Sequence, residues 1–210
     1  MFIYLCDVSE QMCEAWANEF ADIDGAEILC GSIFNCPADA LVSPANSFGF
    51  MDGALDAMIT EQLGTQVQDR VRDLLAREFY GELLVGQAVI VPTDHEHFPY
   101  LISAPTMRTP AALPADTVNP YLATRAVLRL LMDNIMVLQT GEEVPIRDVI
   151  ETIAISGLGT GVGQVPYEVC ARQMHQAVVE VLIDGNPMPR DWDDVTDRFL
   201  DLTARPEVIA

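Results

Sequence analysis

The chain contains no lysine. Its 210 residues include 32 Asp and Glu against 11 bases, all of them arginine, so the net charge is −21. The missing lysine excludes both a Schiff base and a P-loop lysine. A strongly negative surface repels nucleic acid and anionic membranes, which makes both poor partners. A phosphorylated ligand would therefore be held mainly by backbone N–H groups and helix dipoles, with an arginine as the one basic side chain to help.

Long hydrophobic runs are missing too. No apolar run reaches the roughly 18 residues that span a bilayer. The first eleven residues lack the basic start and long apolar region of a signal peptide. The cysteines, at positions 6, 13, 30, 36 and 170, form no CxxC pair, and no histidine is placed to activate one of them. This usage is typical of reduced, mostly buried thiols, so we expect a cytoplasmic protein.

Half of the residues are apolar, which is enough for a sizeable core. Apolar runs predict strands over residues 2–6, 26–30, 38–42, 86–92, 100–104 and 149–156. Helical spacing of apolar residues predicts helices over residues 9–20, 55–63, 67–79, 121–138 and 166–183. This alternation indicates a three-layer α/β/α sandwich with a mixed central sheet. We expect that domain to occupy residues 1–185, followed by an acidic tail, residues 186–210, with one short helix.

Residues 43–53, called here the first loop, form the first candidate site. A short apolar strand ends at Ser43, and a polar stretch with Asn46 follows. Asp52 and Gly53 then lead into a helix, because Asp can cap a helix and Gly lets a ligand approach the backbone. Free N–H groups converge at a helix N-terminus, so this arrangement is typical of anion binding. An ordinary strand–loop–helix connection is an equal alternative.

Residues 157–163, called here the second loop, carry four glycines between a predicted strand and a predicted helix. A backbone without Cβ atoms can wrap closely round a ligand and turn its N–H groups inward. The GxGxxG fingerprint fails because Val162 and Gln164 stand where glycine is required, and GxSxG is absent. A nicotinamide-dependent oxidoreductase and an α/β-hydrolase are therefore disfavoured. A turn needed only for packing is the alternative.

Together the two loops resemble the macro domain family of ADP-ribose binders. Residues 43–47, SPANS, correspond to the family's N-A-A-N-S segment, and the family's aspartate ten residues after the second Asn falls on Asp56. Residues 159–166, GTGVGQVP, correspond to its S-T-G-I-Y-G-F-P loop. The resemblance covers about residues 26–183 and implies the macro domain fold.

The resemblance also implies a split nucleotide site. Asn46 would hydrogen-bond the distal ribose, Asp56 would lie near that ribose, and the second loop would cradle the phosphates. In family members that hydrolyse ADP-ribosyl bonds, a bound water attacks the anomeric carbon. Asn46 and Asp56 are thus the implied catalytic residues. The implied partner is ADP-ribose or an ADP-ribosylated substrate, and we expect no cofactor and no metal. The implied ligand-binding residues are Ser32, Ile33, Ser43, Ala45, Asn46, Phe50, Gly53, Asp56, Gly157, Leu158, Gly159, Thr160, Gly161, Val162 and Gly163.

Several positions depart from the family pattern. Ser32 replaces the aspartate that contacts adenine, Ser43 replaces the first Asn, and Gly163 and Val165 replace an aromatic pair. Asp52 is an added acid that could cap the helix, act in catalysis or repel phosphate. These departures keep open a second reading, a non-catalytic nucleotide-binding or interaction module on the same fold.

A third reading is an unrelated nucleotide-using enzyme with a metal ion. His95 and His97 form an H-x-H pair with acidic neighbours. Two histidines are fewer ligands than a metal site needs, and loop histidines are usually solvated.

Overall fold

Short segments rich in Val, Ile and Leu form a six-stranded sheet in the order β2-β1-β8-β3-β5-β4. The computed structural model describes residues 1–138 and 140–204. All neighbouring pairs in the sheet are parallel except β4 and β5, which are antiparallel. The predicted mixed sheet is therefore confirmed. Its strands are β1 (Phe2–Asp7), β2 (Ala26–Cys30), β3 (Ala40–Ser43), β4 (Val89–Pro92), β5 (Tyr100–Ser103) and β8 (Thr152–Ile155).

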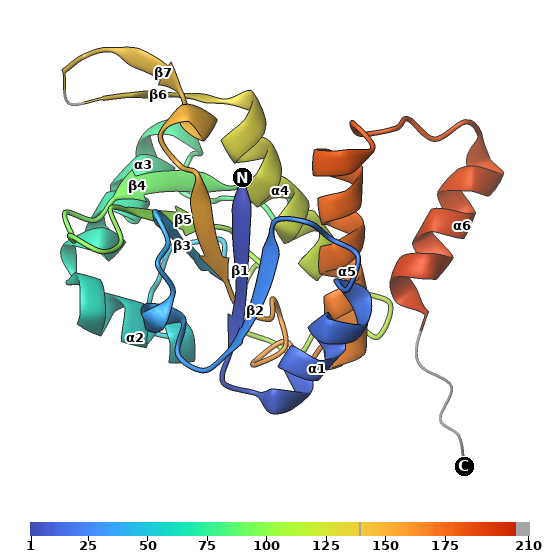
Figure 1. The fold of residues 1–210 in the computed structure, drawn as a ribbon. Coiled ribbons are helices and arrows are strands. Elements are labelled where there is room, and N and C mark those ends of the chain that lie inside the picture. Colours follow the sequence, from blue (N-terminus) through green and yellow to red (C-terminus); the bar gives the residue numbers. More distant parts are fainter. Residues whose placement is uncertain (139, 205–210) are drawn as a thin grey trace.

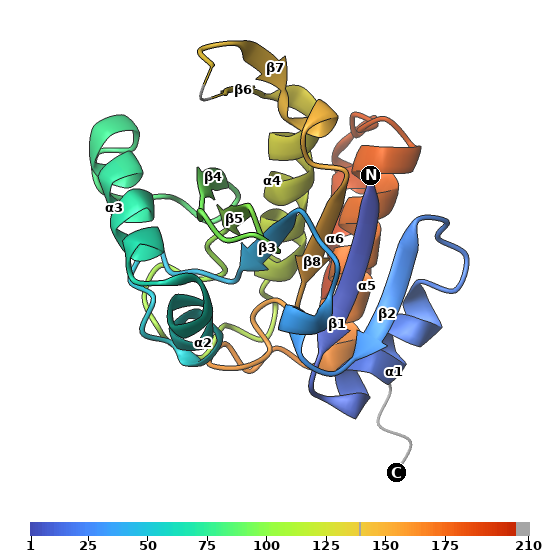
Figure 2. The same cartoon turned by 60° about the vertical axis from the view of Figure 1, so that its left-hand side comes forward.

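Helices cover both faces of the sheet, which confirms the three-layer sandwich (Figures 1 and 2). The helices α2 (Ala54–Leu63) and α3 (Gln66–Glu78) pack on one face. The opposite face is covered by α1 (Glu10–Glu19), α4 (Asn119–Asp133) and α5 (Tyr167–Val178), the last of which continues as a π-helical turn over Val179–Ile183.

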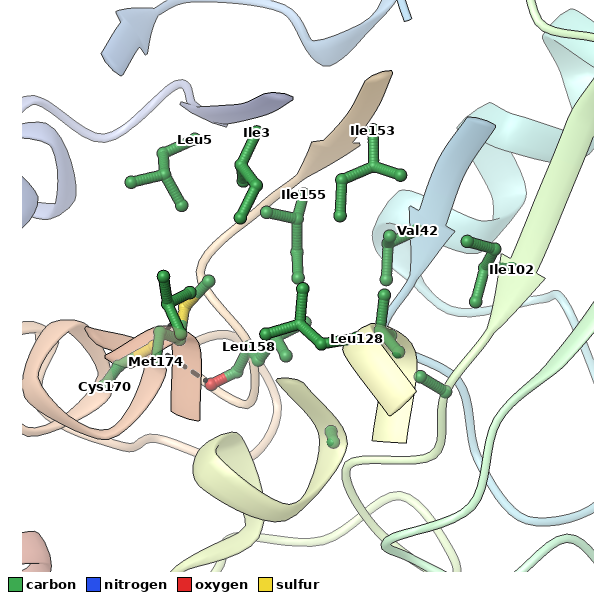
Figure 3. Close-up of a cluster of buried hydrophobic side chains, with 14 of the residues drawn as sticks. Ile3, Leu5, Val42, Ile102, Leu128, Ile153, Ile155, Leu158, Cys170 and Met174 are labelled. Carbon is green, nitrogen blue, oxygen red and sulfur yellow. Dashed lines mark hydrogen bonds between the residues drawn. The ribbon is translucent and has the colours of Figure 1, made fainter. Parts of the chain in front are cut away.

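The core between the sheet and the second group of helices is almost entirely aliphatic. Leu5 and Ile155 point from neighbouring strands toward Leu128 of α4 and Met174 of α5 (Figure 3). Each fully buried Leu or Ile contributes about 2 kcal/mol relative to an exposed one. Leu158 of the second loop belongs to this core, where its carbonyl oxygen accepts a hydrogen bond from the Cys170 thiol at 3.3 Å. The core therefore anchors the second loop directly.

The helix predicted over residues 121–138 is wrong at its C-terminal end. The helix α4 ends at Asp133, and the chain turns into a hairpin of β6 (Ile135–Val137) and β7 (Glu143–Pro145). Ile135 and Val137 are 61% and 67% exposed, so their apolar spacing reflects an outlying hairpin rather than a buried helix face.

The C-terminal part of the described chain is the helix α6 (Trp192–Thr203), which packs on α5. Gln173 of α5 donates to the carbonyl oxygen of Leu202 at 3.0 Å. The division at residue 185 into a domain and a tail stays a prediction, and residues 205–210 of that tail lie outside the described residues. Within residues 1–138 and 140–204, no helix is long and apolar enough to cross a membrane.

Candidate functional site

The parallel strands β1, β3, β5 and β8 all end at the same edge of the sheet, and the loops that follow them surround one cleft of about 440 Å³. Ligands of open α/β sheets commonly bind at this edge. The cleft is lined by Cys6, Asp7, Val8, Ser9, Gly31, Ser32, Ile33, Phe34, Pro44, Ala45, Asn46, Asp52, Gly53, Ala54, Leu55, Asp56, Met58, Thr106, Met107, Pro110, Ser156, Gly157, Gly159, Thr160, Gly161, Val162 and Tyr167.

Most of the residues predicted to bind ligand meet in this cleft, although they come from three separate stretches of sequence. Those that line it are Ser32, Ile33, Ala45, Asn46, Gly53, Asp56, Gly157, Gly159, Thr160, Gly161 and Val162. Four predicted residues lie outside its lining. Ser43 and Leu158 are fully buried, Gly163 is packed against the second loop itself, and Phe50 is on the outer side of the first loop.

The first loop is held in shape by the side chain of Asn46. Its Oδ1 accepts from the backbone N–H groups of Phe48 and Phe50 at 3.0 and 3.4 Å, and its Nδ2 donates to the Phe50 carbonyl oxygen at 2.7 Å. The Phe50 ring is 47% exposed and lies 4.0 Å from the guanidinium carbon of Arg72. In this structure the Asn46 amide therefore stabilises its own loop, and Phe50 stacks on a cation.

Asp56 lies in the first turn of α2, buried at the cleft wall. The Ser43 hydroxyl donates to its Oδ1 at 2.5 Å. Burial raises the pKa of Asp56 to about 6; the nearby charge of Asp52 adds to this rise and the Ser43 hydrogen bond opposes it. Near neutral pH this carboxyl group can thus exchange a proton, which is a requirement for general acid–base chemistry.

Asp52 does not cap α2, so the expectation that it caps the helix is wrong. The N-cap residue is Gly53, and no side chain in the described part of the chain caps that end of the helix. Asp52 instead presents an exposed carboxylate at the cleft. Gly53, with an extended φ of −72° and ψ of 168°, brings the bare helix N-terminus to the same place.

The second loop offers backbone donors to the cleft. Within the described residues, the N–H groups of residues 158–163 donate no hydrogen bond, whereas the carbonyl oxygens of Gly157, Gly159 and Gly161 accept bonds that fold the loop. A Cβ on Gly163 would overlap the Gly159 carbonyl oxygen, so the loop requires glycine there. Unpaired N–H groups in a glycine-rich loop form a typical anion site.

Electrostatically, the cleft combines carboxylates with helix N-termini. Asp7, Asp52 and Asp56 line it, and no arginine or histidine does within the described part of the chain. The first residues or caps of α1, α2 and α5 also border it, and each helix N-terminus carries about half a positive charge. An anion in this cleft would be held by backbone dipoles, as the lack of lysine predicts.

Asp7 and Thr106 are among the cleft residues that the sequence prediction missed. Asp7 accepts from the N–H of Ser9 at 3.0 Å and from the N–H of Gly157 at 3.1 Å, so it ties the start of α1 to the second loop. Its position directly after a buried strand could have identified it. Thr106 is buried, and its Oγ1 has no hydrogen-bond partner among the described residues. No sequence motif marks Thr106.

The geometry does not support the hypothesis of a metal ion at His95 and His97. Among residues 1–138 and 140–204, no group of three His, Cys, Asp or Glu side chains could hold a metal ion. His95 accepts from the backbone N–H of His97 at 3.2 Å and stacks on Phe98. These contacts give the H-x-H pair a local role in its own loop.

The architecture and the cleft define a three-layer α/β protein with a ligand site where two loops meet. Comparison with known proteins identifies the family to which this protein belongs. Residues 42–174 match the Macro domain family. An uncharacterized protein of Aquifex aeolicus (strain VF5) is 33% identical over 152 residues, which are 72% of this chain and 79% of that relative. The chain belongs to the macro domain family.

Two solved structures share the fold. The macrodomain of Mycobacterium tuberculosis DarG aligns with a TM-score of 0.56 at 18% identity, covering 73% of this chain and 89% of that chain. Thermosipho africanus DarTG in complex with ADP-ribose aligns with a TM-score of 0.56 at 13% identity, covering 87% of this chain and 51% of that chain. Both candidate loops lie within the residues that match the family.

Proposed function

We propose that the cleft binds ADP-ribose or an ADP-ribosyl group, with its phosphates on the second loop. The observation that carries this proposal is the run of unpaired backbone N–H groups over residues 159–162, which line a cleft with no basic side chain among the described residues. The N-termini of α1, α2 and α5 add attraction for an anion. A family relative solved in complex with ADP-ribose supports the choice of ligand.

Calorimetry with free ADP-ribose tests this proposal. We expect saturable binding of one ligand per chain, with an affinity that changes little between 50 mM and 200 mM salt, because fixed backbone dipoles rather than exposed charges hold the phosphates. No detectable heat with millimolar ADP-ribose would contradict it.

The cleft is also suited to hydrolysing an ADP-ribosyl bond. Attack of water on the anomeric carbon passes through a transition state with positive charge on the ribose, and carboxylates stabilise such a charge more than they stabilise the neutral sugar. Asp56 and Asp52 supply two carboxyl groups. In this scheme Asp56, with its pKa raised to about 6, polarises the attacking water.

The alternative is a non-catalytic binding module, which the geometry of Asn46 favours. Its Oδ1 and one N–H of its Nδ2 are used within the first loop, which leaves a single N–H for a ribose or a water. A turnover assay on ADP-ribosylated protein separates the two functions. Hydrolysis that falls at least tenfold in both Asp56→Ala and Asn46→Ala supports catalysis, whereas binding without turnover in the wild-type chain supports the module.

A further inference from the structure

A second cavity, of about 230 Å³, lies between α4 and the segment that leads into β4, and it shares no lining residue with the cleft. The two elements can be followed in Figures 1 and 2. Its walls are formed by Phe79, Gly86, Gln87, Ala88, Leu122, Arg125, Ala126, Arg129, Leu130 and Asn134. The cavity is therefore part apolar and part polar, as small-molecule sites usually are.

The charged residues of this cavity are both arginines. Arg125 and Arg129 are four residues apart on α4, so they lie on the same face of the helix. Among residues 1–138 and 140–204, no Asp or Glu lines the cavity. In a chain with 32 acidic residues and 11 bases, a concave site with two arginines and no acid is the reverse of the overall charge.

Arg125 is the unusual member of the pair. It is half-buried and forms no ion pair with any described residue. Its Nη2 reaches only the neutral Oδ1 of Asn186, at 3.5 Å, and its buried Nε has no hydrogen-bond acceptor in the described part of the chain. Arg129 pairs with Asp133 at 3.4 Å through exposed side chains, which is a weak contact. Guanidinium donors are thus available at this site.

Of the neutral polar groups, Gln87 offers a donor and Asn134 an acceptor, because the Asn134 Nδ2 already donates to the carbonyl oxygen of Arg129 at 3.3 Å. Gln87 uses its Oε1 to accept from the N–H of Leu84 at 2.9 Å, and its amide nitrogen donates to no described residue. Phe79, Leu122 and Leu130 form the apolar wall. A ligand with one anionic head and a short apolar body would satisfy the two arginines, Gln87 and the apolar wall.

We propose that this cavity, the α4 anion site, binds a small organic anion whose phosphate or carboxylate head contacts Arg125 and Arg129. Guanidinium groups recognise both heads through paired N–H donors. The volume is below the roughly 300 Å³ at which drug-sized ligand pockets begin, so the site takes a fragment-sized molecule rather than a whole nucleotide. The site does not depend on the function proposed for the cleft.

Titration of the full chain with phenyl phosphate tests the site, with benzoate and inorganic phosphate as further probes. We expect saturable binding of phenyl phosphate that weakens at least tenfold in the double variant Arg125→Gln, Arg129→Gln. The charge-matched control Arg147→Gln, Arg190→Gln changes two exposed arginines elsewhere, and we expect it to alter the affinity less than twofold. Equal weakening in both variants, or no saturable binding of phenyl phosphate and benzoate, would overturn the site.

Three further measurements keep the result specific. Arg129→Gln alone replaces an exposed side chain, so we expect an unchanged melting temperature and about threefold weaker binding, even if the double variant does not fold. Saturating ADP-ribose should leave phenyl phosphate binding unchanged, and competition would place the probe in the cleft and overturn the proposal. Inorganic phosphate should bind several-fold more weakly than phenyl phosphate; equal affinity would contradict the role of the apolar wall.

Discussion

The first and second loops border the same cleft, but the first contributes side chains to it and the second contributes backbone groups. The first loop uses side chains, because Asn46 fixes its shape and Asp52 carries a charge to the cleft. The second loop uses its backbone, since the N–H groups of residues 159–162 line the cleft and donate to no described residue. On the proposed function, anion binding therefore falls to the second loop. The first loop, with Asp56 behind it, supplies the negative charge that a developing cation on a ribose would need.

The largest expected effect comes from Gly163→Ala in the second loop. The added Cβ would overlap the Gly159 carbonyl oxygen, so the loop must move. We expect an affinity loss for ADP-ribose of about 100-fold, equal to about 3 kcal/mol. Calorimetry measures it. The matched control is Gly161→Ala, whose Cβ meets no atom within 4 Å, and we expect its melting temperature to equal that of the wild type. Wild-type affinity in Gly163→Ala would show that the shape of the second loop does not matter.

The raised pKa of Asp56, on the carboxylate side of the cleft, makes the stability of the protein depend on pH. Its pKa is raised from 3.8 to about 6 in the folded state, so folding is disfavoured by ionisation of this group. The free energy of unfolding should therefore fall as pH rises through this range, by about 2 kcal/mol between pH 4 and pH 6 from this group alone. Urea unfolding across this range measures the fall.

The control for this measurement is the isosteric variant Asp56→Asn. It keeps an oxygen acceptor for Ser43 but cannot ionise, so it should lack this part of the pH dependence. The exposed Asp148→Asn should retain the wild-type profile. A wild-type profile in Asp56→Asn would mean that burial does not shift the pKa of Asp56.

Asn46→Ala tests the side-chain support of the first loop. It removes the two hydrogen bonds that the side chain accepts and the one that it donates, all of them with Phe48 and Phe50. We expect a loss of about 2 kcal/mol in the free energy of unfolding. Asn46→Asp keeps the acceptor and should lose less. If Asn46→Ala keeps full stability but loses ADP-ribose binding, Asn46 contacts the ligand rather than its own loop.

The smallest expected effect comes from Asp52→Asn, which removes one exposed carboxylate from the cleft. Weaker repulsion should tighten ADP-ribose binding about threefold at low salt, and the gain should shrink as salt screens the charge. Calorimetry at 20 mM and 500 mM salt measures both. A weaker affinity in this variant would indicate that Asp52 hydrogen-bonds the ligand.

Much of the fold could be predicted from the sequence because its signals are local. Continuous apolar runs identify all six strands of the main sheet, and Ser9 caps α1 by accepting from the N–H of Met12, as its position before an apolar helix face predicts. The hairpin of β6 and β7 could not be predicted in this way. Ile135 and Val137 continue the helical spacing of α4, and only pairing with residues 143–145 makes them a strand.

The candidate site, too, could be predicted only in part. The glycine pattern of the second loop can be seen in the sequence, and the resemblance to the family points to Asp56; the structure brings Asp56, Gly157, Gly159 and Gly161 to one cleft. The use made of each side chain could not be read from spacing, because it depends on contacts made in three dimensions. Phe50 stacks with Arg72 from α3, and Asp7 bonds to Gly157, which is 150 residues away.

The most direct test of the account follows the backbone amides of the second loop by nuclear magnetic resonance as ADP-ribose is added. The account predicts that the N–H signals of Gly159, Thr160, Gly161 and Val162 shift most, because these groups line the cleft and donate no hydrogen bond within the described chain. Large shifts confined to other residues, with these four signals unchanged at saturation, would contradict it.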